Sequence, residues 1–156
     1  MTNDEQFMAL ALACAKQAQS EGEVPVGAVV VHDGVVIGKG SNAPISRHDP
    51  SAHAEIIALR DAALREQNYR LTGATMYITL EPCAMCVGAM IHARIERVVF
   101  AAREPKAGML VSHTALLDSA CFNHQLTIEE GVLADECSQL LSDFFKQRRR
   151  EAKMRS

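Results

Sequence analysis

The sequence predicts an α/β domain in which a mixed, partly parallel sheet is covered by helices on both faces. Segments with helical periodicity alternate with short β-branched segments after an opening hairpin, as expected for strands joined by helical crossovers. The 156 residues, 48% of them hydrophobic, suffice for one core and are too few for two ordinary domains. We therefore expect a single domain over residues 1–156, without internal repeats.

Four segments are predicted to be helices because their apolar residues recur at steps of three and four. In the first, Phe7, Leu10 and Cys14 follow this spacing and Gly22 provides a stop. Pro82 is well placed to open the third helix. The predicted helices are residues 4–21, 52–64, 83–93 and 133 to about 154, with 114–119 as a further short candidate.

Five short segments rich in β-branched residues are predicted to be strands. Asp33-Gly34 separates the first two and is a strong hairpin signal. Gly38 and Gly40 are interpreted as a strand end or a bulge, because a lone Gly-x-Gly is weak support for a phosphate loop. The predicted strands are residues 25–31, 35–38, 75–80, 97–101 and 126–129, and the polar residues 41–51 are expected to form a loop.

Positive charge is concentrated at the carboxyl-terminal end, although the whole chain has a net charge of −3. Residues 146–156 carry six of the sixteen Lys and Arg residues and one of the nineteen Asp and Glu residues, which leaves ten basic and eighteen acidic residues elsewhere. A basic helix of this kind is typical of proteins that contact phosphate backbones. A charged tail that only keeps the protein soluble explains the cluster equally well.

Cysteine usage favours a reducing compartment. The chain has five cysteines, an odd number, and two of them form a Cys-x-x-Cys pair, which favours a metal over a disulfide framework. No run is long enough to span a membrane, and residues 1–22 lack the pattern of a signal peptide. We expect a cytoplasmic protein with no membrane partner, in which Cys14, Cys121 and Cys137 serve as small apolar residues.

One imidazole, one carboxylate and two thiols have the spacing of a catalytic metal site. Cys83 and Cys86 lie about one helical turn apart, and His53 can supply a third ligand from another segment. Zinc is the expected metal, and three protein ligands leave one position for water. Glu55 shares a helical turn with His53 and is the candidate general acid/base, since it need not bind the metal itself. Backbone N–H groups at the two helix starts could stabilise negative charge.

The motifs His53-Ala54-Glu55 and Pro82-Cys83-Ala84-Met85-Cys86 resemble the signature of zinc-dependent nucleoside and nucleobase deaminases, the cytidine/deoxycytidylate deaminase superfamily. Further segments, spread over nearly the whole chain, resemble the bacterial tRNA-specific adenosine deaminases. These segments are residues 23–29, Asn42, 47–55, 67–71, 79–83, 88–95 and 133–137.

The resemblance implies a three-layer α/β/α cytidine-deaminase-like fold with a central mixed five-stranded sheet, one zinc ion per subunit and a homodimer. It also implies hydrolytic deamination of adenosine to inosine at the wobble position (position 34) of a tRNA anticodon stem-loop. In that reaction a zinc-activated hydroxide attacks C6 of the flipped-out adenine, and Glu55 shuttles the proton.

The resemblance further implies substrate contacts for residues that have simpler explanations when taken alone. The pocket residues would be Val24, Asn42 and Ala54, and the RNA contacts would be Lys106, Arg148 and Phe145. Without the family, Asn42 fits a turn, and Val24 and Ala54 fit a core. Helical periodicity places at least one of Phe144 and Phe145 in the core, so only the other can meet a splayed base.

The chain departs from the family pattern in one loop. After Arg103 the family usually has Asp-x-Lys-Thr-Gly-Ala-x-Gly-Ser, whereas this sequence has Glu-Pro-Lys-Ala-Gly-Met-Leu-Val-Ser at residues 104–112. Small residues have become bulky and apolar at Met109, Leu110 and Val111. The change leaves the zinc chemistry intact and concerns substrate stringency and the dimer contact.

Two other functions stay open. The first is a deaminase of a free guanine, cytosine or nucleoside on the same fold, although a small neutral substrate needs no cluster of arginines. The second is a non-catalytic RNA-binding module with structural zinc, which requires a fourth protein ligand that the sequence does not mark.

Overall fold

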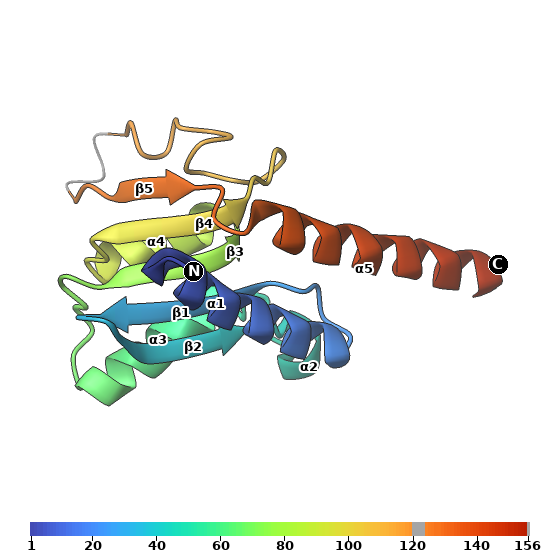
Figure 1. Ribbon diagram of the computed structural model, residues 1–156, viewed down its shortest axis with the longest axis horizontal. Helices are drawn as coiled ribbons and strands as arrows, with labels where there is room; N and C mark the ends of the chain where they lie inside the picture. Colours follow the sequence, from blue (N-terminus) through green and yellow to red (C-terminus); the bar gives the residue numbers. More distant parts are fainter. Residues whose placement is uncertain (120–123, 156) are drawn as a thin grey trace.

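The computed structural model describes residues 1–119 and 124–155 and contains a mixed sheet of five strands (Figure 1). The strands are β1 (Gly27–His32), β2 (Val35–Ser41), β3 (Thr75–Leu80), β4 (Arg97–Ala102) and β5 (Thr127–Glu130). Among the described residues their order in the sheet is β2-β1-β3-β4-β5. β1 is antiparallel to β2 and β3, whereas β3, β4 and β5 are mutually parallel. The predicted mixed sheet is confirmed.

Helices cover both faces of the sheet, which gives the three-layer α/β/α arrangement expected from the sequence. α1 (Asn3–Ser20) and α5 (Ala134–Arg155) pack on one face. α3 (Ala54–Glu66) and α4 (Ala84–His92) pack on the other. α4 joins the parallel strands β3 and β4, so its amino-terminal end lies at the carboxyl edge of β3.

Side chains of the central strands alternate between two apolar clusters, because successive residues of a strand face opposite sides. The cluster under α1 and α5 contains the sheet residues Val29, Val31, Tyr77 and Val99. The cluster under α3 and α4 contains Val30, Met76, Ile78, Val98 and Phe100. Strands buried on both faces read as continuous apolar runs, which explains the apolar segments in the sequence.

Two glycines mark places where a helix lies directly on the sheet backbone. A Cβ atom on Gly40 would lie 2.1 Å from the Ala54 carbonyl oxygen in α3, and one on Gly27 would lie 2.0 Å from the Ala11 carbonyl oxygen in α1. Both Gly38 and Gly40 lie inside β2, which continues to Ser41, so the strand does not end there. The register with β1 shifts between the pairs Val30–Gly38 and Val31–Val36, which agrees with the predicted bulge at Gly38. The absent side chain of Gly40 lets the amino-terminal end of α3 approach the strand closely.

The loop segments differ in two places from the prediction. The stretch 41–51 contains a single helical turn, α2 (Pro44–Arg47), with Pro44 at its first position. Residues 114–119 form hydrogen-bonded turns in place of the short helix, with the Asp118 amide donating to the Thr114 carbonyl. Cys14 is half-buried and Cys137 buried, whereas Cys121 lies outside the described residues.

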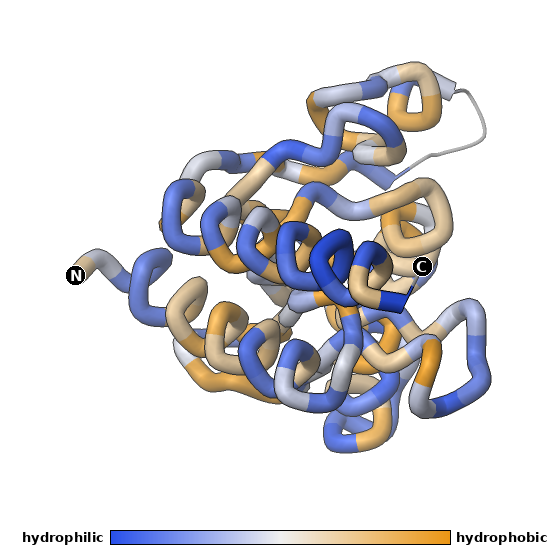
Figure 2. The backbone as a smooth tube through the Cα atoms, turned by 90° about the vertical axis from the view of Figure 1, so that its right-hand side faces the viewer, coloured by the Kyte–Doolittle hydropathy of each residue, from blue (hydrophilic) through white to orange (hydrophobic). Residues whose placement is uncertain are grey.

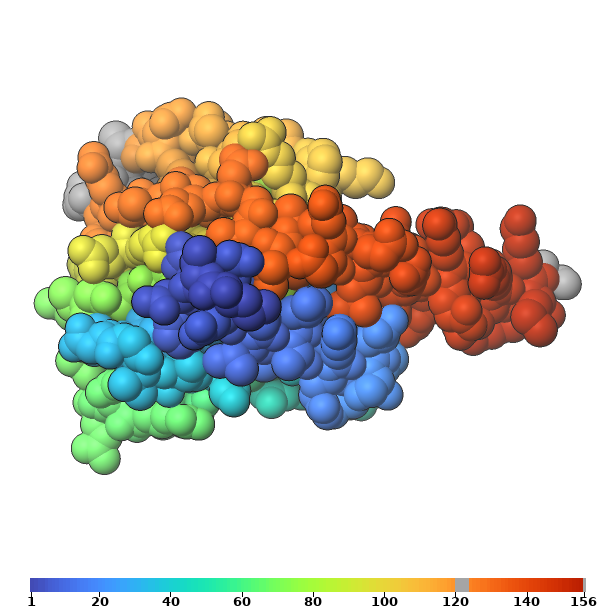
Figure 3. Space-filling view, viewed as in Figure 1, coloured from blue at the N-terminus to red at the C-terminus, as the bar shows by residue number. Residues whose placement is uncertain are grey.

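α5 extends past the edge of the sheet, so its carboxyl-terminal half projects from the body of the molecule (Figures 1 and 3). Viewed from that end, hydrophilic residues dominate the helix (Figure 2). Its buried residues are Cys137 and Phe144, both in the first half. Within the described residues, none of the helices has the length and apolar character needed to cross a membrane.

Candidate metal centre and substrate pocket

The two halves of the predicted metal site lie at the amino-terminal ends of α3 and α4. His53 is the N-cap residue of α3 and Cys83 is the N-cap residue of α4, and both have extended backbone conformations. Neither side chain caps its own helix, so the imidazole and the thiol are free to point toward each other. Cys86 lies in the first turn of α4. The positive ends of two helix dipoles therefore meet at the thiols and stabilise thiolates there.

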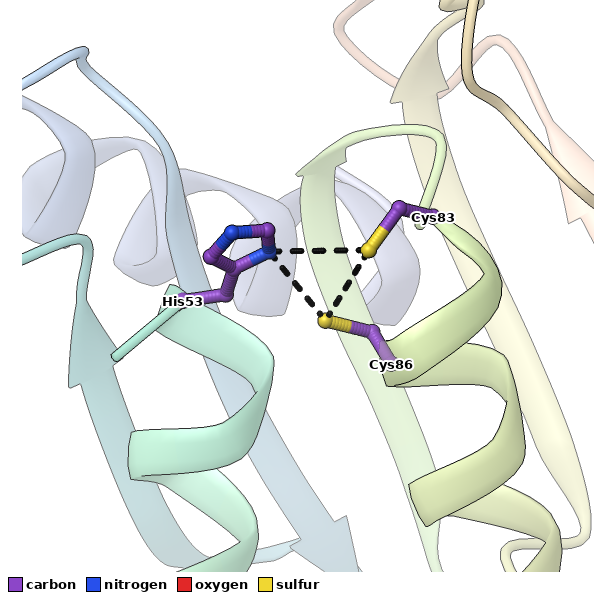
Figure 4. A group of neighbouring side chains, drawn as sticks. All are labelled: His53, Cys83 and Cys86. Atoms are coloured by element: carbon purple, nitrogen blue, oxygen red, sulfur yellow. Dashed lines mark hydrogen bonds between the residues drawn. The ribbon is translucent and has the colours of Figure 1, made fainter. Parts of the chain in front are cut away.

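The three side chains form a compact triangle (Figure 4). His53 Nδ1 lies 3.6 Å from Cys83 Sγ and 3.5 Å from Cys86 Sγ, and the two sulfur atoms are 3.8 Å apart. A tetrahedral zinc ion with bonds of about 2.3 Å to sulfur and about 2.0 Å to nitrogen separates its ligands by about 3.8 Å (S–S) and about 3.5 Å (S–N). The donor set and its spacing therefore fit zinc.

Hydrogen bonds among the three side chains of the triangle shift their pKa values. The hydrogen bond between the two thiols lowers the pKa of Cys83 and raises the pKa of Cys86. The hydrogen bond to Cys83 also raises the pKa of His53. A divalent ion that takes all three ligands must displace the remaining protons, which makes its affinity dependent on pH.

Glu55 is a buried carboxyl group beside the triangle. It lies in the first turn of α3, is only 4% exposed, and lines the same pocket as His53 and Cys83. Burial raises the pKa of Glu55 to about 7. A carboxyl group that gains and loses a proton near neutral pH is suited to general acid/base chemistry.

A pocket of about 330 Å³ opens above these groups. His53, Glu55 and Cys83 line it together with Val24 and Asn42 from the segments that flank β1 and β2. Glu81 also lines it, as do Glu104 and Ala107 from residues 104–112, called the rim loop below. The volume is at the lower end of the range for small-molecule sites and suits one nucleoside.

The structure brings together two of the three predicted pocket residues. Asn42 is 8% exposed, and its side-chain amide donates to the Val24 carbonyl at 3.2 Å, so the two residues form one wall. Ala54 is fully buried within the cluster under α3 and α4, and its side chain is not among those that line the pocket. Its role in substrate binding stays a prediction.

The predicted RNA contacts lie on two different parts of the surface. Lys106 is exposed on the rim loop. Phe145 is 45% exposed, whereas its neighbour Phe144 is 7% exposed, so Phe144 is the core residue of the pair. Arg148 stacks over the Phe144 ring at 4.9 Å and donates to the Gly22 carbonyl, which ties α5 to the turn after α1.

Two buried carboxylates have no role predicted from the sequence, and one of them, Glu81, lines the pocket. Glu23 accepts hydrogen bonds from the Ile45 and Ser46 amides at the start of α2. Burial opposes ionisation, but these bonds outweigh it and lower the pKa of Glu23. Glu81 is 3% exposed; burial opposes its ionisation too, and bonds from the rim loop lower its pKa to about 2. An acidic residue next to an apolar strand, as at Glu81, is the signal that could have drawn attention to it.

Comparison with known proteins connects this arrangement to one family. The cytidine and deoxycytidylate deaminase zinc-binding region matches residues 1–102 of this chain. A tRNA-specific adenosine deaminase of Haemophilus influenzae is 52% identical over 152 residues, which cover 97% of this chain and 88% of that protein. A tRNA-specific adenosine deaminase of Bacillus subtilis is 43% identical over 153 residues, covering 98% of this chain and 95% of that protein.

A solved structure shows the same likeness in three dimensions. It comes from work on A-to-I editing by tRNA:A34 deaminases at the wobble position of transfer RNA. Its sequence is 39% identical to this chain, and the alignment covers 87% of this chain and 99% of that one with a TM-score of 0.85.

Proposed function

This chain belongs to the cytidine and deoxycytidylate deaminase zinc-binding family and, within it, to the tRNA-specific adenosine deaminases, and we propose that it hydrolyses adenosine to inosine at position 34, the wobble position of a tRNA anticodon. The observation that carries this proposal is the His53, Cys83 and Cys86 triangle on the floor of a nucleoside-sized pocket, next to the buried Glu55. A structural zinc site needs no such pocket and no adjacent carboxyl group.

The residues divide the chemistry between them. His53, Cys83 and Cys86 would hold one zinc ion per subunit, and the bound ion supplies Lewis-acid activation of a water molecule near neutral pH. Glu55 would carry the two protons of the attacking water, one to the ring nitrogen and one to the departing amine, so that one water is consumed and one ammonia leaves. Burial raises the pKa of Glu55, and a raised pKa makes the carboxylate a better proton acceptor.

The walls of the pocket and α5 would bind the RNA. Val24 and Asn42 line the pocket and would flank the base, and Lys106 on the rim loop would meet the backbone beside it. Phe145 presents an exposed ring on which a splayed base could stack. Arg148 has five N–H donors and uses one on Gly22, which leaves others for a phosphate.

The homodimer, the cytoplasmic location and the single-domain organisation stay predictions. Light scattering coupled to size-exclusion chromatography tests the homodimer directly. A mass of about twice the 17.0 kDa of one chain supports it, and a mass of one chain contradicts it.

The test of the proposed function is nucleoside analysis after incubation with an anticodon stem-loop that bears adenosine at the wobble position. Free adenosine, cytidine and guanine are incubated in parallel. Inosine from the stem-loop alone is the expected result. Turnover of only a free base or nucleoside would mean that the substrate class is wrong, and RNA binding without any turnover would favour the non-catalytic module.

A variant separates catalysis from zinc binding. Glu55→Gln removes the carboxylate and keeps the side-chain shape, so we expect inosine formation to fall by at least about a hundredfold, with the zinc content unchanged. Glu66→Gln is the matched control, because Glu66 is exposed at the far end of the same helix. Full activity in Glu55→Gln would contradict the assigned proton transfer.

A further inference from the structure

Glu81 occupies an unusual position between the sheet and the metal site. It directly follows β3 and precedes Pro82 and the ligand Cys83 by one and two residues. Its side chain is 3% exposed, and it faces the rim loop. An ionised carboxylate at such a buried position requires several hydrogen-bond donors.

The rim loop supplies these donors almost entirely from its backbone. Glu81 Oε1 accepts from the Glu104 amide at 3.1 Å and from the Ser112 hydroxyl at 2.5 Å. Oε2 accepts from three consecutive amides, those of Leu110, Val111 and Ser112, at 3.0, 2.7 and 2.8 Å. A carboxylate offers about four lone-pair positions, and five donors use them. Glu81 therefore has no acceptor capacity left for a substrate.

Other contacts show that the loop is folded around this carboxylate. A Cβ atom on Gly108 would lie 2.3 Å from the Glu81 carboxyl carbon, so only glycine allows the loop to pass here. The Met109 amide donates to the Pro82 carbonyl at 2.9 Å. Leu110 is 3% exposed and belongs to the core cluster under α3 and α4, and Met109 and Val111 pack against that cluster. The bulky residues of this loop thus anchor it to the core.

The loop in turn forms one wall of the substrate pocket. Glu104 and Ala107 line the pocket together with Val24 and Asn42. Glu104 is held to Glu81 through its amide, and its own side chain accepts from the Lys106 amide at 3.0 Å. The position of this wall therefore depends on the Glu81 carboxylate, which is itself among the residues that line the pocket.

We propose that Glu81 is a positioning residue that determines substrate fit by holding the rim loop in the shape that forms one wall of the pocket. The proposal rests on the proposed function and deepens it. Loss of the carboxylate loosens the wall and weakens the binding of the anticodon loop, while zinc and Glu55 stay in place. The KM for the stem-loop therefore rises, whereas kcat stays nearly constant.

The test uses Glu81→Gln in the full-length zinc protein. An amide group cannot replace the carboxylate in either orientation: its NH2 group meets either the three amides at Oε2 or the Glu104 amide at Oε1. We expect hydrogen exchange at the amides of Leu110, Val111 and Ser112 to be at least about tenfold faster, which is the scale of losing a hydrogen bond to a charged group. The KM for the stem-loop should rise about tenfold or more, with kcat within about threefold and zinc content unchanged.

Three further variants serve as comparisons for the Glu81→Gln result. Ser112→Ala removes one donor of five and should raise KM only a few-fold, without the folding risk of a change at Glu81. Glu81→Asp keeps the charge and should restore part of the effect. Glu129→Gln removes an ion pair between β5 and Arg97, the first residue of β4, and should leave KM and loop exchange unchanged, which controls for a general loss of stability.

The outcomes separate this proposal from the proposed function. Unchanged exchange in Glu81→Gln, or faster exchange with an unchanged KM, would overturn the positioning role. So would a fall in kcat at constant KM. A wild-type protein that makes no inosine from the stem-loop would refute the proposed function, and the exchange data on the same samples would still show whether Glu81 organises the loop.

Discussion

Replacing Gly40 by alanine should push α3 away from the sheet and weaken zinc binding. The new Cβ atom would lie 2.1 Å from the Ala54 carbonyl oxygen and 2.7 Å from the Ala58 nitrogen, and both of these are backbone atoms that cannot rotate away. Real Cβ contacts are not shorter than 3.0 Å, so the start of α3 must retreat by about 1 Å or more. His53 directly precedes Ala54 and would move with it.

The magnitude follows from how little misplacement a zinc site tolerates. Ligand distances must stay within about 0.2 Å of their ideal values, and a retreat of about 1 Å exceeds this several-fold. We expect zinc affinity to fall by a factor of about 10 to 100, the range seen when the support of a metal ligand is lost. Overpacking should also lower the free energy of unfolding of the zinc-free protein by about 1–3 kcal/mol.

The measurement is competition for zinc against a chromophoric chelator, together with thermal unfolding with and without zinc. Gly88→Ala is the control, because a Cβ atom there meets nothing within 4 Å and Gly88 lies in α4, the other helix of the site. It should leave zinc affinity unchanged and stabilise the helix by up to about 1 kcal/mol. A Gly40→Ala protein with wild-type zinc affinity would refute the claim that this glycine determines the position of α3.

Three further predictions concern the core, the pH dependence and the charge. Leu110→Ala should lower the free energy of unfolding by about 2–5 kcal/mol and raise the KM for the stem-loop, as denaturant titration and kinetics would show; a loss below about 1 kcal/mol would contradict its burial. Hydrogen bonds from Arg97 lower the pKa of Asp4 in the folded state, so its contribution is fully present above its ordinary value of 3.8 and is lost as the pH falls toward the folded pKa. Asp4→Asn should flatten the acid limb of a stability–pH curve, and an unchanged limb would exclude this pair as its cause. Replacing Arg149 and Arg150 by alanine should reduce the slope of log Kd for RNA against log salt concentration by up to about two, and a slope equal to wild type would place the phosphates elsewhere.

The sequence was sufficient where a structural feature is encoded by neighbouring residues. The Asp33-Gly34 hairpin depends on backbone preferences of two adjacent positions, and the observed strands flank it. The zinc site could be predicted because Cys83 and Cys86 are spaced by a helical turn and because few other chemistries use this ligand set with His53. The helices could be predicted from the three- and four-residue spacing of their apolar residues, since each helix buries one stripe of apolar side chains.

Features that depend on distant segments could not be predicted in this way. The donors to Glu81 lie 23 to 31 residues further along the chain, so no local pattern marks the carboxylate as the centre of a loop. α2 is a single turn, too short to show a period, and it was therefore assigned to a loop. The reason for the bulky Leu110 could not be predicted from its neighbours in the sequence, because its burial depends on the folded loop and the core beneath it.

The projection of α5 gives the molecule an electric polarity that its net charge conceals. Residues 149–155, about 10 Å of helix, follow Arg148, which donates to the Gly22 carbonyl in the turn after α1. This length is comparable to the Debye length of about 8–10 Å in physiological salt. Dissolved ions therefore weaken the influence of the acidic residues of the body on the basic tip of α5. An approaching polyanion consequently experiences a torque as well as an attraction. The protein can turn its basic end toward the polyanion before any contact forms, even though the chain as a whole is negative.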